Sequence, residues 1–158
     1  MNNPEISLPT ITAALSDFLK NNFPDSTVYN NPNQQNTTLP AWFINFMPSS
    51  GIGKQVDNRY LRTLYVDLVY LLDYNLTDLY DQYTGAAEIL DENLELFTYV
   101  NNDDSYLIRT YERKWNMGLA DLHYKFKLDI RVSLSEPDNA KMLTIEQLNK
   151  DVVERGVD

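Results

Sequence analysis

The segment from Asp121 to Leu134 alternates strictly between apolar and polar residues, and this alternation constrains the fold more than any other part of the sequence. It reads DLHYKFKLDIRVSL, with an apolar side chain at every even position and a polar one at every odd position. Successive side chains of a β-strand point to opposite faces, whereas a helix would bury some of these charges. The segment is therefore predicted to be a long strand, with one face on a hydrophobic core and the other on water or a partner.

Other segments show the periodicities of helices and strands. Stripes at helical spacing predict a helix capped by Thr10 and ending near Asn21, and a longer helix that opens at Asn75 or Thr77. The buried stripe of the longer helix includes Tyr80 and runs on to Phe97. Alternation predicts strands over residues 26–29, 41–46, 60–72 and 106–115, the last with an edge position or a bulge. Residues 47–57 are predicted to be a flexible loop, residues 101–104 an exit turn, and residues 116–120 the turn of a final antiparallel hairpin.

This order of elements predicts an α+β fold. We expect a mainly antiparallel sheet of four to five strands with two helices packed on one face. Residues 1–134 are predicted to form this domain. Residues 135–158 are predicted to be a C-terminal extension with a short helix over about Ile145 to Glu154, because Thr144 and Gln147 have the spacing of a capping box.

The composition excludes several classes of protein. The chain has 158 residues and no cysteine, so it has no disulfide framework, thiolate zinc site or cysteine nucleophile. The start, MNNPEIS, lacks the basic and apolar regions of a signal peptide, and no apolar run approaches the length of about 18 residues that spans a membrane. We therefore expect no contact with a membrane, and assembly in a reducing cytoplasm.

Two segments invite a catalytic or ligand-binding interpretation, and neither fits it. Gly51-Ile52-Gly53-Lys54 differs from a phosphate-binding loop because Gln55 follows Lys54 and a strand, not a helix, follows the loop. His123 is the single histidine and has no neighbour in sequence that completes a triad or a metal cluster. We therefore predict no catalytic residue, no metal and no cofactor.

The net charge of −10 is distributed unevenly. Residues 73–104 contain nine acidic residues and no Lys or Arg, whereas the rest of the chain has fourteen acidic residues (23 − 9) against thirteen basic ones. This distribution has three interpretations: the acidic residues form a solvated helix face, the acidic helix and the basic strands neutralise each other within one molecule, or they join identical copies head to tail, which can close a ring. The candidate interface residues are Lys54, Arg109, Arg113, Lys114, His123, Lys125, Lys127 and Arg131 on the basic side, and Glu88, Asp91, Glu92 and Glu95 on the acidic helix.

Four segments together resemble the tail terminator family of tailed phages and prophages from Gram-positive hosts. They are ITAALSDFLKNNFPDSTVY, AWFINFMPSS, NRYLRTLYVDLVYLLD and MGLADLHYKFKLDIRV, which follow in this order between Ile11 and Leu134. Each segment alone is mostly a core pattern. Their order and spacing carry the resemblance.

The resemblance implies a structural protein of the virion, located at the tail–neck junction, and not an enzyme. Family members form a ring, typically hexameric, that caps the tail tube protein, ends its polymerisation and offers a docking surface to the neck or head-completion protein. In contractile tails the ring also meets the sheath protein. DNA would only pass through the lumen, which an acidic lining would favour because like charge disfavours phosphate binding. The alternatives are another head–tail connector or tail-completion protein, an acidic protein that binds a host factor, or a small acidic soluble enzyme.

Overall fold

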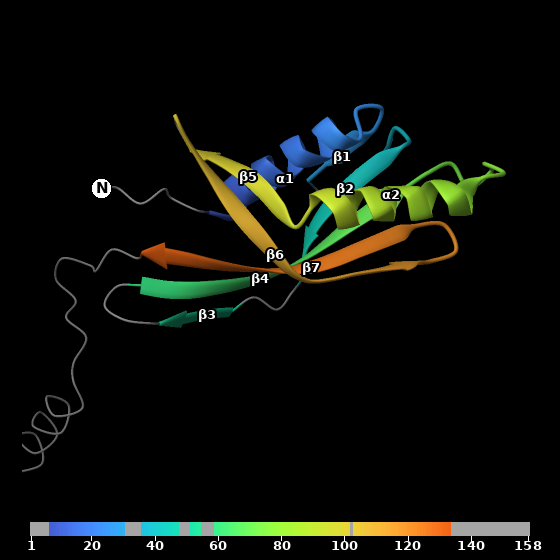
Figure 1. The fold of residues 1–158 in the computed structure, drawn as a ribbon. Helices are drawn as coiled ribbons and strands as arrows, with labels where there is room; N and C mark the ends of the chain where they lie inside the picture. The colour runs from blue at the N-terminus through green and yellow to red at the C-terminus, as the bar shows by residue number, and fades with distance from the viewer. Residues whose placement is uncertain (1–6, 31–35, 48–50, 55–58, 102, 134–158) are drawn as a thin grey trace, which may run out of the picture.

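The described chain folds into two helices and a curled, seven-stranded sheet (Figure 1). The computed structural model describes residues 7–30, 36–47, 51–54, 59–101 and 103–133. Within these residues the elements are α1 (Leu8–Asn22), β1 (Thr27–Tyr29), β2 (Ala41–Phe46), β3 (Gly51–Lys54), β4 (Arg59–Leu71), α2 (Leu79–Asn93), β5 (Leu96–Asn101), β6 (Asp104–Met117) and β7 (Leu122–Ser133). The strands lie in the order β1-β2-β4-β7-β6-β5, and β3 also pairs with β4. Only β1 and β2 pair in parallel among these strands, so the predicted α+β class and the mainly antiparallel sheet are confirmed.

Strand β7 lies at the centre of the sheet and has the two faces that its alternation predicts. It pairs antiparallel with β4 along almost its whole length, from Tyr70 opposite Leu122 to Arg59 opposite Ser133. Its even-numbered side chains from Leu122 to Ile130 are all buried, whereas the odd-numbered ones between them are partly exposed. The prediction of a half-buried strand is therefore confirmed over the side chains that the structure describes.

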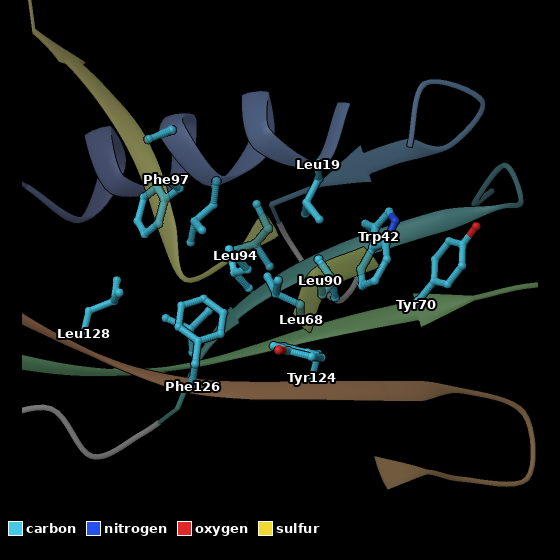
Figure 2. Close-up of a cluster of buried hydrophobic side chains, with 14 of the residues drawn as sticks. Leu19, Trp42, Leu68, Tyr70, Leu90, Leu94, Phe97, Tyr124, Phe126 and Leu128 are labelled. Atoms are coloured by element: carbon cyan, nitrogen blue, oxygen red, sulfur yellow. The ribbon is translucent and has the colours of Figure 1, made fainter. Parts of the chain in front are cut away.

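The core lies between the helices and the inner face of the sheet, which we define as the face that carries the even-numbered side chains of β4 and β7 (Figure 2). Both helices contribute to this single cluster, α1 through Leu15 and Leu19 and α2 through Leu90. At one end the rings of Trp42 and Tyr70 stack with their centroids 4.2 Å apart. Such pairs add to the stability that burial of their area provides.

Tyr83 joins three elements at this end of the core. Its ring is buried and meets the Tyr70 ring edge-on at 6.0 Å. Its hydroxyl accepts a hydrogen bond from the Leu72 N–H at 3.1 Å and donates one to the Ala120 carbonyl at 2.8 Å. One side chain of α2 therefore holds both the end of β4 and the turn between β6 and β7.

Helix α1 begins three residues earlier than predicted. Ser7 is its N-cap, with Thr10 as the reciprocal partner in a capping box, so the prediction of Thr10 as the cap is wrong. Pro9 lies within the first turn, where a missing N–H costs nothing because that group has no partner inside a helix.

Helix α2 is shorter than predicted at both ends. It begins after Asp78 and stops at Asn93, and the chain continues as strand β5. Tyr80 is 67% exposed and does not belong to the buried stripe. Phe97 is buried as predicted, but from β5, because Phe97 and Tyr99 alternate with exposed residues along a strand that pairs with β6. The spacing of Leu90, Leu94 and Phe97 fits a helix equally well, which explains the error.

Strand β3 was also not predicted. It pairs antiparallel with β4, from Gly51 opposite Thr63 to Lys54 opposite Tyr60, within the segment that we expected to be a loop. Its two glycines explain the error, because glycine has a low strand propensity although its backbone can still pair with a neighbouring strand. With β3 and β5 the sheet has seven strands instead of four to five. The predicted C-terminal helix lies outside the described residues.

Strand β6 makes the sheet curl. Its first half pairs with β5, from Asn101 opposite Asp104 to Leu96 opposite Arg109, and its second half pairs with β7. The register with β7 shifts between Tyr111 and Lys114, which confirms the predicted bulge. The β5–β6 hairpin rises out of the sheet beside α1, and α1 contacts β5 as well as β1 and β2 (Figure 1).

Replacing Tyr83 by Phe tests the three-way junction. We expect Tyr83→Phe to lower the free energy of unfolding by about 1–3 kcal/mol, because it leaves the Leu72 N–H and the Ala120 carbonyl without their shared partner. Chemical denaturation measures the change. Tyr80→Phe, on the exposed side of the same helix, is the matched control and is expected to stay within about 0.5 kcal/mol of the native chain. Equal stability of the two variants would contradict the assignment.

Candidate interaction surfaces

The odd-numbered side chains of β4 and β7 form the outer face of the sheet, which is turned away from the helices. The strand register places Asn45, Asp67, Lys125 and Lys114 in one row across β2, β4, β7 and β6. The adjacent row contains Tyr65, Lys127 and Tyr111, and the row on the other side contains His123. Four of the eight predicted basic residues, Lys114, His123, Lys125 and Lys127, therefore gather on one face.

His123 is held between two carboxylates on this face. Its Nδ1 lies 2.9 Å from Asp67 Oδ2, and its Nε2 lies 3.0 Å from Asp121 Oδ2. An ionised carboxylate only accepts hydrogen bonds, so the arrangement favours the imidazolium form of the ring, in which both nitrogens donate. Partial burial alone would lower the pKa of His123, but the hydrogen bonds and charges of Asp67 and then Asp121 outweigh it and raise the pKa above its ordinary value. This histidine fastens β7 to β4 and to the preceding turn.

Lys127 is neutralised within its own strand. Its ammonium lies 3.3 Å from Asp129 Oδ2, and Thr63 donates a hydrogen bond to the other oxygen of the same carboxylate at 2.9 Å. The hydrogen bond and charge of Asp129 raise the pKa of Lys127.

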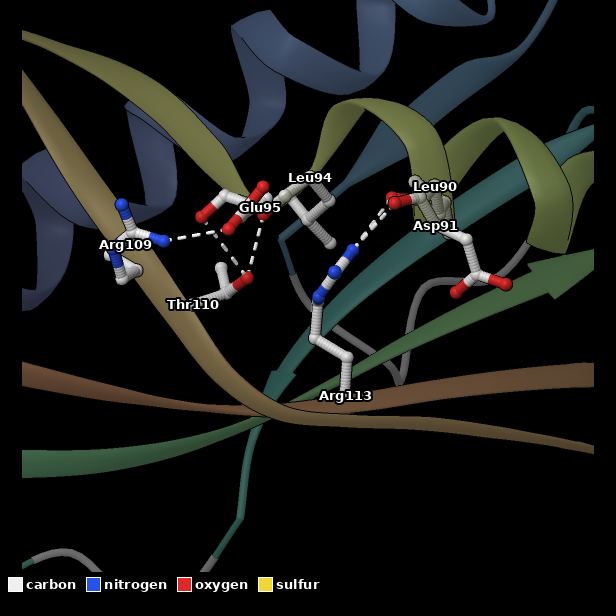
Figure 3. A network of polar contacts seen from close by, with 7 residues as sticks. All are labelled: Leu90, Asp91, Leu94, Glu95, Arg109, Thr110 and Arg113. Atoms are coloured by element: carbon white, nitrogen blue, oxygen red, sulfur yellow. Dashed lines mark hydrogen bonds and ion pairs between the residues drawn. The ribbon is translucent and has the colours of Figure 1, made fainter.

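Arg109 and Thr110 of β6 bind Leu94 and Glu95, which connect α2 to β5 (Figure 3). Arg109 Nη1 lies 2.7 Å from Glu95 Oε1 in an exposed ion pair. Thr110 donates from its hydroxyl to the Leu94 carbonyl at 2.7 Å and from its backbone N–H to the Glu95 carbonyl at 2.9 Å. One predicted acidic residue and one predicted basic residue thus pair with each other inside the chain.

The bulge in β6 aims Arg113 at the carboxyl end of α2. Glu112 has a φ of 53°, a left-handed conformation, and the extra residue of the bulge turns the next side chain out of the strand register. Arg113 Nη1 then donates to the Asp91 carbonyl at 2.8 Å and to the Leu90 carbonyl at 3.5 Å (Figure 3). The last turn of α2 contains no basic residue of its own. Arg113 therefore supplies the positive charge that stabilises a helix carboxyl end.

Asp91 also has an internal partner, because Tyr124 donates a hydrogen bond from its hydroxyl to Asp91 Oδ1 at 2.7 Å. Burial, followed by the Asp91 hydrogen bond and charge, raises the pKa of Tyr124 well above its ordinary value. The phenol therefore stays protonated and remains a donor.

Four of the predicted interface residues have no internal partner among the described residues. Lys114 and Lys125 form no hydrogen bond or ion pair there, although the neighbouring Asp67 has one buried oxygen without a donor. Glu88 and Glu92 are exposed on α2 and likewise form none. Lys54 lies in β3 and Arg131 in β7, but their side chains are outside the described part of the structure. Neutralisation inside the molecule thus accounts for some of the predicted charges, but not for these four.

The β5–β6 hairpin exposes apolar side chains that were not predicted from the sequence. Val100 is 63% exposed and Leu107 67% exposed, and Leu96 lies on the same side of the hairpin. A helical interpretation of residues 94–97 concealed them, whereas the alternation of Leu96, Thr98 and Val100 with buried Phe97 and Tyr99 could have indicated them. Grouped exposed apolar side chains are typical of protein–protein contact sites.

The described residues include no group of three His, Cys, Asp or Glu side chains that could hold a metal ion. In the same part of the chain, neither helix is long and apolar enough to cross a membrane.

Comparison with known protein families gives a match. A family model described as "Phage tail terminator protein" matches residues 10–141. Among the described elements, the matched range contains every strand and all but the first two residues of α1. No curated protein matches the sequence.

The hydrogen bonds of His123 with Asp67 and Asp121 predict how the stability of the fold depends on pH. A raised folded-state pKa means that the stabilisation is complete below the unfolded pKa of about 6.5 and is lost as pH rises through the folded pKa. We expect the free energy of unfolding to fall across this window in the native chain and to fall less in His123→Gln. NMR titration of the single histidine should give a pKa above 6.5, and Asp67→Asn should lower it. An unshifted pKa of His123 in the native chain would contradict the assignment of these two hydrogen bonds.

The hydrogen bonds of Arg113 to the carboxyl end of α2 predict a loss of stability when this side chain is truncated. Arg113→Ala should lower the free energy of unfolding by about 1–2 kcal/mol, because two carbonyl groups at the end of α2 lose a charged donor. Thermal or urea unfolding measures the change. The adjacent Lys114→Ala removes an equal charge without an internal partner, and its stability is expected to match the native chain within about 0.5 kcal/mol. A similar effect of both variants would argue against a specific cap.

Proposed function

We propose, from the premise that this chain belongs to the phage tail terminator protein family, that it closes the end of the phage tail tube as a ring and stops the tube from growing. Family membership supports a structural and assembly role in a phage tail, and a tail protein is a component of the virion. The observation that carries the proposal is the extent of the match, which covers nearly all of the described fold.

The finer features of this role are also proposed. The ring contains six copies, sits at the tail–neck junction, and is assembled in the host cytoplasm. One rim contacts the tail tube protein and the other receives the neck or head-completion protein, with the sheath protein as a further neighbour in a contractile tail. DNA passes through the lumen without being bound, and the role makes and breaks no covalent bond.

The β5–β6 hairpin supports a role in protein–protein contact. One side of the hairpin carries exposed apolar side chains, those of Leu96, Val100 and Leu107. They lie next to the ion pair that Arg109 forms with Glu95. Apolar area supplies most of the free energy of protein association, whereas charges mainly set orientation. We assign this surface to contact with another tail component or a neighbouring subunit.

Adding the purified protein to polymerising tail tube protein tests the function. We expect shorter tubes, each with a disc at one end, in negative-stain electron micrographs, and a mean tube length that falls as the added protein increases. Tube lengths that are the same with and without the protein would overturn the proposal.

A variant of the hairpin sharpens this experiment. Leu107→Asp should fold normally, because the residue is exposed, but should cap tubes less efficiently since a charge now lies in the apolar contact. Leu8→Asp introduces the same charge on an exposed leucine of α1 and is expected to cap tubes like the native chain. Thermal unfolding checks that both variants are folded.

A further inference from the structure

We propose that Lys114 and Lys125 on the outer face of one copy contact Glu88 and Glu92 on α2 of a second copy. This inference rests on the proposed function, since it names the two surfaces through which ring subunits would meet. It commits to a second copy of this chain because the chain itself carries both halves of the contact.

The lysine half is a pair of like charges that the fold holds together. Lys114 and Lys125 are directly opposite each other in the β6–β7 pair, so they lie on the same face. Like charges in this arrangement repel each other across the strands. Asp67 is opposite Lys125 on β4, but its carboxylate is bound to His123 and makes no ion pair with the lysine. A carboxylate from outside the molecule would relieve this repulsion.

The glutamate half is a matching pair on the exposed side of α2. The buried residues of this helix are Tyr83, Ala86, Ala87 and Leu90. With 3.6 residues per turn, Glu88 and Glu92 fall on the side opposite to these four. They are one helical turn apart, where like charges repel, and Glu92 lies near the carboxyl end of the helix, where a negative charge is unfavourable. An external cation would relieve both effects.

The spacing of the two pairs is compatible. Residues four apart on a helix have Cβ atoms about 5–6 Å apart, and directly opposite residues of two antiparallel strands are separated by about 4.5–5.5 Å. Each glutamate can therefore face one lysine. Among the predicted interface residues whose side chains the structure describes, only these four lack an internal partner. The others that have one are Arg109, Arg113, Lys127, His123, Glu95 and Asp91.

The two pairs lie on opposite sides of the same molecule. Helix α2 covers the inner face of the sheet (Figure 1). The strand register places the lysines on the outer face. One molecule therefore cannot join its own lysines to its own glutamates. A contact between different surfaces of two copies is heterologous, and such contacts build a ring when the rotation between copies closes.

Charge reversal on each half tests the contact. Lys114→Glu with Lys125→Glu, and separately Glu88→Lys with Glu92→Lys, should each weaken self-association by about tenfold or more at low salt, measured by sedimentation velocity. A variant with Lys114→Glu and Lys125→Gln serves the same purpose without placing a further carboxylate beside Asp67. Lys20→Glu and Asp17→Lys, on the exposed side of α1, change the net charge in the same directions at single positions and should associate like the native chain.

Mixing the two reversed variants is the decisive step. Each variant alone carries the same charge on both surfaces and repels itself, whereas an equimolar mixture restores opposite charges at every contact and should assemble in alternation. Native-like association of the two variants alone, or no recovery in the mixture, would overturn the inference. If the native chain still forms rings and caps tubes in that case, only the inference fails. If the native chain neither associates nor caps tubes, the proposed function fails with it.

Discussion

The antiparallel pairing of β4 with β7 is the constraint on which the rest of the structure depends. Because side chains alternate along both strands, one register determines the core and the outer face at the same time. The same register that buries Leu68 against Tyr124 brings His123 to Asp67 and Thr63 to Asp129. A slip by one residue would exchange the two faces and bury the lysines. The polar contacts of the outer face therefore reinforce the register that the core selects.

The bulge in β6 is the second constraint, because it joins the sheet to the helix layer. Strand β6 pairs with β5 beside α1 as far as Arg109, and it pairs with β7 from Thr110 onward, on both sides of the bulge. At the bulge itself, Arg113 turns from the strand to the carbonyl groups that end α2. Without the extra residue, Arg113 would follow the regular alternation of side chains between the two faces, and the helix end would be left without a cation. The left-handed backbone of Glu112 is the local strain that this arrangement requires.

The sequence predicted those elements in which the pattern of apolar and polar side chains matches the buried and exposed faces. Long alternation identified β4 and β7, because one face of each is buried and the other is not. Strand β3 could not be found in this way, because its glycines have no side chains that could show such a pattern. Its pairing with β4 is through the backbone. Strand β5 was hidden because a short apolar run fits both helical and strand spacing. Charges posed a different difficulty: the sequence located Arg109 and Glu95, but only the curl of the sheet brings them together.

The distribution of unpaired charge favours one mode of association over another. If two copies met through the same outer face, Lys114 and Lys125 of one would approach the same lysines of the other, and like charges would repel. Two copies meeting through α2 would oppose Glu88 and Glu92 in the same manner. Only the contact between unlike surfaces brings opposite charges together, and that contact leaves one free surface at each end of any open chain of subunits. When the rotation between neighbouring copies closes, such subunits add until the last meets the first. The charge pattern that discourages a two-fold dimer is therefore the same pattern that supports the closed ring we propose for this member of the tail terminator family.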